Sequence, residues 1–196
     1  LPLFDYHTHL CAKDMLEDAP FTDPASLFLI NDHYKWRLMR ANGTPERFVT
    51  GGAPGYEKFC AFARTLPYAA GNPIYVWTHL ELKRYFEIDV PLCADNADEI
   101  WHALEAQLRS GGCTPRALIA RSNVHTLVTT DDPAEDLAYH AELAKDASFQ
   151  TRVLPGFRPE RAGEIWRGGE WRAYLETLGE AADTEITSFS TLVDAL

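Results

Sequence analysis

Cysteine is scarce in this sequence, and its placement disfavours a disulfide framework. There are four cysteines, and no two of them form a CxxC pair. The chain is also neither short nor rich in cysteine, as disulfide-stabilised secreted domains are. We therefore interpret Cys11, Cys60, Cys93 and Cys113 as reduced thiols of a cytoplasmic protein, buried as small hydrophobic side chains.

Long hydrophobic runs and an excess of basic residues are also lacking. No apolar stretch is long enough to span a bilayer, and no signal peptide is visible. The sequence has 18 Lys and Arg residues against 29 Asp and Glu residues, and its net charge is −11. An acidic surface disfavours nucleic acid and membranes as partners, although a few local arginines can still bind a small anionic substrate.

The length and composition are typical of a globular enzyme. Hydrophobic residues make up 46% of the sequence and charged residues 24%. A chain of 196 residues can form one large domain or two small ones, each with a hydrophobic core. Because Leu1 leads directly into a strand pattern and Leu196 lies inside an expected helix, we expect a piece of a longer protein.

Three short apolar runs predict β-strands, at residues 1–9, 124–130 and 151–159. Asp23-Pro24, Asp32 and Asn72-Pro73 are helix-start signals, and Asn96 with Glu99 resembles a capping box. In residues 74–86 the apolar positions recur at helical spacing. The expected helical segments are 24–69, 74–86, 99–110, 116–123, 134–146, 169–183 and 188–196.

The order of these elements predicts an α/β fold. Alternation of strands and helices after residue 113 indicates parallel βαβ units. The helical stretch over 20–112 is too long for a crossover connection, so we interpret it as an inserted helical subdomain. The predicted divisions are a first strand and loop at 1–19, the insertion at 20–112, and further β/α units at 113–196.

His7 and His9 are the first candidate site residues. Alternate side chains of a strand share a face, so the two imidazoles can converge on one divalent metal. In a barrel they would lie at the carboxyl end of the strand, where such folds keep their active sites. The alternative is a pair of surface histidines at a strand end.

The helix start at Asp32 carries the second candidates, His33 and Tyr34. Both can act as an acid, a base or a hydrogen-bond donor to a hydroxylated ligand. Helix N-terminal N–H groups also favour a nearby anion. The alternative is a solvated amphipathic helix with Trp36 packed inward.

Arg158 is the third candidate, because a Pro155-Gly156 turn presents it just after a strand. An arginine there can bind a carboxylate through two parallel hydrogen bonds; the alternative is a surface arginine. After the preceding strand, a carboxylate of Asp131 or Asp132 could face the site, although the pattern favours a turn with a helix cap by Asp132. Trp77, His79 and His125 lie in apolar stretches typical of core residues.

Several segments, in this order, resemble the uronate isomerase (glucuronate isomerase) family of the amidohydrolase superfamily. An HxH motif is shared widely in that superfamily, whereas DHYKWR followed by the NP-x-Y-x-WTHLEL pattern is far more specific. The resemblance covers most of the chain. The matching segments are FDYHTHL (4–10), NDHYKWRLMRANG (31–43), GNPIYVWTHLELKRYF (71–86), ADEIWHAL (97–104), TTDDP (129–133), YHAELAKD (139–146) and VLPGFRPE (153–160).

The resemblance implies the N-terminal part of a (β/α)8 TIM-type barrel with an inserted helical subdomain. It implies an aldose–ketose isomerase that interconverts D-glucuronate with D-fructuronate and D-galacturonate with D-tagaturonate. His7 and His9 would contribute to a divalent metal site, with zinc expected, and His33 and Tyr34 would lie in the sugar-acid site. Arg158 would help to hold the substrate. The family completes its site with an aspartate and an arginine from later strands, which this sequence does not contain.

Two other functions stay open from the sequence. One is a metal-dependent hydrolase of the same superfamily, although neither later strand offers the lysine that two-metal members use. The other is a non-catalytic sugar-acid-binding fragment. A homo-oligomer is expected for the full-length protein, but the oligomer size, the metal and the preferred uronate cannot be read from the sequence.

Overall fold

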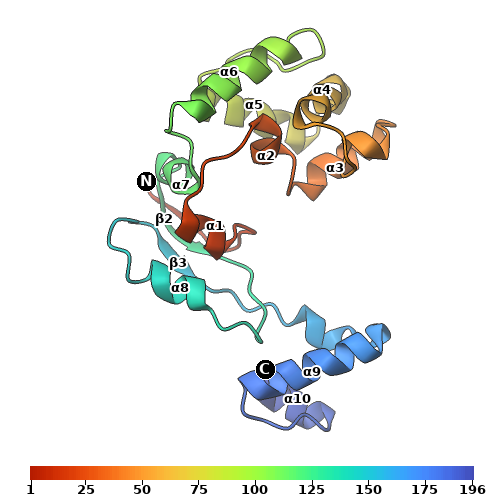
Figure 1. Ribbon diagram of the computed structural model, residues 1–196, viewed down its shortest axis with the longest axis vertical. Coiled ribbons are helices and arrows are strands. Elements are labelled where there is room, and N and C mark those ends of the chain that lie inside the picture. Colours follow the sequence, from red (N-terminus) through yellow and green to blue (C-terminus); the bar gives the residue numbers. More distant parts are fainter. The chain divides into compact units, whose positions relative to one another are not determined.

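The computed structural model describes residues 1–196, which divide into two compact units (Figure 1). Unit 1 consists of Leu1–Asp18 and Ile119–Leu196, and unit 2 is the intervening segment Ala19–Leu118. None of the helices combines the length and the apolar character that crossing a membrane requires.

Unit 1 contains a parallel sheet of three strands, in the order β1-β2-β3. The strands are β1 (Leu3–Asp5), β2 (Val124–Val128) and β3 (Arg152–Leu154). Leu127 pairs with Asp5 on one side and with Val153 on the other. The predicted α/β class with parallel pairing is therefore confirmed.

The three strands are shorter than the apolar runs that predict them. After β1 the chain bends at Tyr6 and His7, where the Asp5 carboxylate accepts the His7 backbone N–H at 3.3 Å. After β3, Pro155 has no N–H to donate to the ladder. Regular pairing ends at these points, and the predicted strands 1–9 and 151–159 are correspondingly too long.

Three helices pack around the sheet and form its small core. They are α1 (Ala12–Glu17), the part of α7 (Pro115–Arg121) from Ile119 on, and α8 (Ala138–Leu143). Met15, Leu127 and Leu143 meet in this core. The prediction of only a strand and a loop in residues 1–19 missed α1, whose N-cap residue Cys11 makes no side-chain cap that a sequence pattern could reveal.

The last part of unit 1 has a third cluster, in which Ala162, Tyr174 and Leu178 are buried. It is formed by the 3-10 helices η3 (Glu160–Gly163) and η4 (Ile165–Arg167) with α9 (Gly169–Ala181) and α10 (Phe189–Ala195). Ser188 and Thr191 form a capping box that starts α10.

The regular secondary structure of unit 2 consists of helices, and this unit has the largest core of the molecule. Its elements are α2 (Pro24–Phe28), α3 (His33–Ala41), η1 (Glu46–Phe48), α4 (Gly55–Thr65), η2 (Leu66–Ala69), α5 (Pro73–Phe86) and α6 (Ala97–Arg109). Phe59 and Phe62 of α4, Leu82 of α5 and Leu104 of α6 are all buried in this core. The segment over which we predicted helices is therefore helical.

Asp23, Asp32 and Asn72 each accept a backbone N–H of the helix that follows. These expected helix starts are confirmed, and α6 begins directly after Asn96, but the capping box expected at Asn96 does not form. Asn96 does not cap α6: its Oδ1 accepts the Cys93 N–H at 2.9 Å and its Nδ2 donates to Pro91 O at 2.8 Å. The side chain is engaged with the preceding loop, so it is not available to the helix.

Two expectations about burial are also corrected. The buried side of α5 consists of Ile74, Thr78, Leu82 and Phe86, a row at i+4 spacing, whereas Trp77 is 55% exposed. Of the four free cysteines only Cys113 is buried, and Cys11 is exposed. Small apolar character alone therefore did not predict which side chains enter the core.

Candidate functional site

The polar residues that follow the strands of unit 1 meet at one edge of the sheet. His7 and His9 follow β1, residues 129–132 follow β2, and Arg158 follows β3. The strands are parallel, so their carboxyl ends lie together. Backbone bonds extend the sheet beyond the regular strands: Thr8 N–H donates to Val128 O at 2.9 Å, and Asp131 forms a parallel bridge with Phe157.

The two histidine rings lie close together at this edge. Their ring centres are 5.3 Å apart and the rings are nearly perpendicular. Both residues lie beyond the end of β1, so the bend at residues 6–7, and not the alternation of a regular strand, brings them together.

This pair of imidazoles is suited to part of a metal site. Imidazole nitrogens bind zinc at about 2.0–2.1 Å, so one nitrogen from each of two rings this close can reach a common ion. Structural and catalytic zinc sites use three or four protein ligands. No group of three or more His, Cys, Asp or Glu side chains in residues 1–196 is arranged to hold a metal. His7 and His9 are therefore suited to supply two of the ligands of such a site.

Arg158 lies at the same edge and is held by a residue that the sequence analysis missed. Its Nε donates to Glu160 Oε1 at 2.7 Å. Bonds from the Glu160 backbone N–H and from Arg158 lower the pKa of Glu160, and the charges of Arg158 and His7 lower it further. Arg158, Glu160 and His7 are thus within electrostatic reach of one another, and the two Nη groups of Arg158 are suited to a bidentate grip on a carboxylate.

Asp131 and Asp132 follow β2 and have different surroundings. Asp131 accepts hydrogen bonds from Thr129 and from the Gly156 N–H. Asp132 accepts from Ala134 N–H at 2.9 Å and from the Tyr174 hydroxyl at 3.0 Å. Asp132 therefore caps the turn that follows it and also ties α9 to the end of β2. The expected turn is present, but the expected helix cap is wrong, because α8 begins only at Ala138, after Leu137.

The second pair of predicted residues, His33 and Tyr34, belongs to unit 2 and begins α3. Their ring centres are 4.3 Å apart. The Asp32 carboxylate accepts the backbone N–H groups of Tyr34 and Lys35 at 3.0 Å each. The Tyr34 side chain is 56% exposed, so its hydroxyl is open to a ligand.

Lys35, next to this pair, was not singled out by the sequence and is buried. Its ammonium lies 3.4 Å from Asp32 and 3.3 Å from Glu81. It also lies 5.2 Å from the centre of the Phe28 ring. These contacts of the Lys35 ammonium thus stabilise the packing of α3. Trp36 packs inward, as the amphipathic interpretation expects.

The remaining histidines of the sequence analysis are one half-buried residue and one exposed residue. His79 Nε2 accepts the Leu92 N–H at 2.9 Å, and burial lowers the pKa of its ring. His125 is exposed, so the expectation that it is a core residue is wrong.

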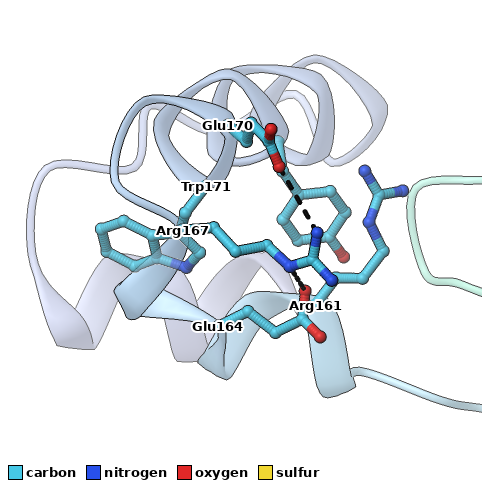
Figure 2. Close-up of a pocket in the computed structure, with 6 residues that line it drawn as sticks. Arg161, Glu164, Arg167, Glu170 and Trp171 are labelled. Carbon is cyan, nitrogen blue, oxygen red and sulfur yellow. Dashed lines mark hydrogen bonds and ion pairs between the residues drawn. The ribbon is translucent and has the colours of Figure 1, made fainter.

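Figure 2 shows a groove of about 220 Å³ on unit 1 that no sequence signal singled out. Arg167 crosses it and pairs with Glu164 at 2.6 Å and with Glu170 at 3.4 Å. Arg161 stacks on the Tyr174 ring at 4.3 Å. The arginines of the groove are engaged by neighbouring side chains, and none of the predicted site residues lines it.

A parallel sheet with imidazoles, carboxylates and an arginine beyond the carboxyl ends of its strands is the arrangement of an α/β enzyme that acts on a small polar ligand. The sequence model of the glucuronate isomerase family matches residues 1–196. The chain belongs to this family.

Individual relatives give the same assignment. The uronate isomerases of Bacillus pumilus and Geobacillus thermodenitrificans are 47% and 46% identical to the chain over 196 residues. The crystal structure of uronate isomerase from Thermotoga maritima matches with a TM-score of 0.90 at 37% identity. Glucuronate isomerase from Caulobacter crescentus matches with a TM-score of 0.88 at 27% identity.

These matches cover all of this chain but only part of each relative. The chain spans 41% of the Bacillus pumilus protein and 42% of the Geobacillus thermodenitrificans protein. It spans 42% of each of the two solved chains. The part of the family that is matched is therefore less than half of a relative's length.

Proposed function

We propose that the protein containing this chain is an aldose–ketose isomerase of uronates, which interconverts D-glucuronate with D-fructuronate and D-galacturonate with D-tagaturonate. The observation that supports this best is the family match over residues 1–196, which includes every candidate site residue. In this reading unit 1 is part of a (β/α)8 barrel, and the helical unit, predicted at 20–112, is an insertion into it.

The reaction requires a proton to leave C2 and return at C1, and negative charge develops on the substrate oxygens. Arg158 binds the substrate carboxylate and fixes the orientation of C1 and C2 relative to the proton-transfer groups. Tyr34 donates or shuttles a proton at a substrate hydroxyl, and His33 assists in holding the sugar acid.

His7 and His9 would hold a divalent metal together with ligands from outside this chain. When bound, such an ion supplies electrostatic stabilisation for negative charge on the substrate oxygens. Zinc as the ion, a homo-oligomeric assembly and a cytoplasmic location stay predictions.

The activity is tested by incubating the protein, in its full natural length, with D-glucuronate and measuring the ketose product. Arg158→Ala should lower kcat/KM by about 100-fold, since it removes a bidentate hydrogen-bonded charge pair. Arg152→Ala is the matched control, because Arg152 is an exposed arginine at the other end of β3. Unchanged kinetics of Arg158→Ala would remove this residue from the site.

The metal role is tested by the double substitution His7→Ala/His9→Ala, with bound metal measured by elemental analysis. We expect the stoichiometric metal to be lost. Replacing two exposed histidines elsewhere, His102 and His125, should leave the metal content unchanged. Full metal content in the His7/His9 variant would show that these residues are not ligands.

A further inference from the structure

One aspartate, Asp131, ties the end of β2 to the turn that carries Arg158. Its backbone N–H donates to Gly156 O at 3.0 Å, and its backbone C=O accepts the Arg158 N–H at 3.0 Å. Its side chain adds a third link, because Oδ2 accepts the Gly156 N–H at 2.9 Å. Both ends of the three-residue turn 156–158 are thus bonded to the same residue.

The Asp131 carboxylate is itself held by two side chains outside the turn. The Thr129 hydroxyl donates to Oδ2 at 2.6 Å, and His140 Nε2 lies 3.5 Å from Oδ1. The Asp131 side chain is only 11% exposed, and the His140 side chain only 9%. A buried carboxylate is costly unless donors satisfy it, so this network fixes the direction in which the carboxylate points.

The hydrogen positions in this network follow from counting donors. The Thr129 hydroxyl has one hydrogen, and its oxygen also lies 2.7 Å from His140 Nε2. Whether the hydroxyl hydrogen goes to Asp131 Oδ2 at 2.6 Å or to Leu154 O at 3.2 Å, His140 must supply the hydrogen of the contact at Nε2. We therefore assign the ring hydrogen to Nε2, so that a chain of hydrogen bonds runs from His140 through Thr129 to Asp131.

The turn is also in close contact with β2. A Cβ atom at Gly156 would lie 2.2 Å from the Thr129 backbone oxygen. The backbone at this position can approach β2 only because residue 156 has no side chain. The turn is therefore fixed both by hydrogen bonds and by a steric limit.

We propose that Asp131 is a positioning residue for the isomerase reaction, which acts through Arg158 and not through contact with the substrate. By holding the 156–158 turn, it keeps the Arg158 guanidinium where the carboxylate of the sugar acid binds. This inference rests on the proposed function, and it adds to it the chain of contacts that orients the carboxylate-binding arginine.

The test is a double-mutant cycle between residues 131 and 158, measured as kcat and KM for D-glucuronate with the protein in its full natural length. Asp131→Ala should lower kcat/KM by about 30- to 100-fold, chiefly through KM, because a displaced arginine weakens substrate binding. In the Arg158→Ala background the same change should cost less than about 3-fold, because the two residues act as one unit. Asp136→Ala is the matched control and should retain wild-type kinetics, because Asp136 is an exposed aspartate whose carboxylate accepts only the Ala138 N–H at the start of α8.

A loss that is equally large with and without Arg158 would overturn the proposal, since Asp131 would then act on stability or on another group. If Asp131→Ala does not fold, Asp131→Asn takes its place in the same cycle. That variant keeps the shape and one acceptor oxygen, and a smaller loss, about tenfold, is expected from it. The same criterion of non-additivity decides the outcome.

A second measurement separates this inference from the proposed function. Amide hydrogen exchange of Gly156 should be at least about tenfold faster in the residue-131 variant than in wild type, since its bond to the carboxylate is lost. Exchange of the Arg158 amide, which bonds to the backbone oxygen of residue 131, should also become faster as the turn loosens. Unchanged exchange would contradict the positioning role whatever the activity. Absence of isomerisation in the wild-type protein, together with faster exchange in the variant, would instead reject the uronate reaction alone.

Discussion

Two buried threonines in the core of unit 2 differ in whether their hydroxyl group makes a hydrogen bond. Thr65 and Thr78 are each 1% exposed. Thr65 Oγ1 donates to Ala61 O at 3.1 Å, whereas Thr78 Oγ1 has no hydrogen-bond partner. A buried hydroxyl without a partner keeps its desolvation cost and gains nothing in return.

Thr78→Val should therefore stabilise the protein by about 1 kcal/mol, because it replaces an unsatisfied hydroxyl by a methyl group of similar size and keeps the β-branch. Thermal or urea unfolding measures the change. Thr65→Val is the matched control and should destabilise the protein, since it removes a satisfied bond. A lower unfolding midpoint for Thr78→Val would mean that the hydroxyl is satisfied in solution.

Glu46 gives a pH dependence to the stability of the same unit. A bidentate bond from Arg40 and a bond from the Thr50 hydroxyl lower the pKa of Glu46 from 4.5 to about 2. A carboxylate whose pKa is lower in the folded state stabilises the protein above its unfolded pKa, and this contribution disappears as the carboxylate is protonated.

The difference in melting temperature between wild type and Glu46→Gln should therefore be present at neutral pH and should shrink as the pH falls from 4.5 towards 2. In the Arg40→Gln background, where the main partner of Glu46 is absent, the difference in melting temperature caused by Glu46→Gln should depend much less on pH. A difference that stays constant through this window would show that the ion pair does not form in solution.

At the scale of elements, the turn after β3 lies in very close contact with the backbone just after β2. Gly156→Ala would place a methyl group against the Thr129 carbonyl, which is backbone and cannot turn away. We expect a loss of about 3 kcal/mol in the free energy of unfolding, since overpacking at a fixed site forces backbone shifts. Gly163→Ala, where an added Cβ meets nothing within 4 Å, is the control and should change stability by less than about 1 kcal/mol.

Elements whose signals are local were predicted from the sequence. Asp32 and Asn72 begin helices because their side chains accept nearby N–H groups, and such caps depend on two or three neighbouring residues. Asn96 has the same local pattern, but the loop before it competes for its side chain. Helix α1 has no cap signal and is held by tertiary contacts of Met15, which no local pattern contains.

The residues of the candidate site could likewise be predicted only where a local sequence pattern marks them. His7, His9 and Arg158 could be named because each follows a strand pattern, and parallel strands bring such positions to one edge. Glu160, Thr129 and His140 could not, because their importance comes from bonds to residues that are distant in sequence or bent back by a turn. Burial of the His140 ring is likewise a consequence of its contact with Thr129, just after β2, and not of its own segment.

At the scale of the whole molecule, the chain has two units with separate cores. Every buried residue of the largest core lies between Ala25 and Cys113, inside unit 2. Unit 1 is made of two segments that are far apart in sequence, and the core around its sheet draws on both the first 18 residues and residues after 118. Unit 2 is continuous, so its core does not depend on the chain outside it.

Residues 19–118, expressed alone, should therefore fold into a helical domain that unfolds cooperatively, because a segment with its own core meets the main requirement of an independent domain. Circular dichroism should show helix, and its loss on heating should be sigmoidal. Phe62→Ala is the control: this ring is fully buried in α4, and its removal should cost about 3–5 kcal/mol, which is enough to unfold a domain of marginal stability. A featureless melting curve for the unmutated segment would show that the helical unit depends on the rest of the chain, and the core between Ala25 and Cys113 would then be necessary but not sufficient for its fold.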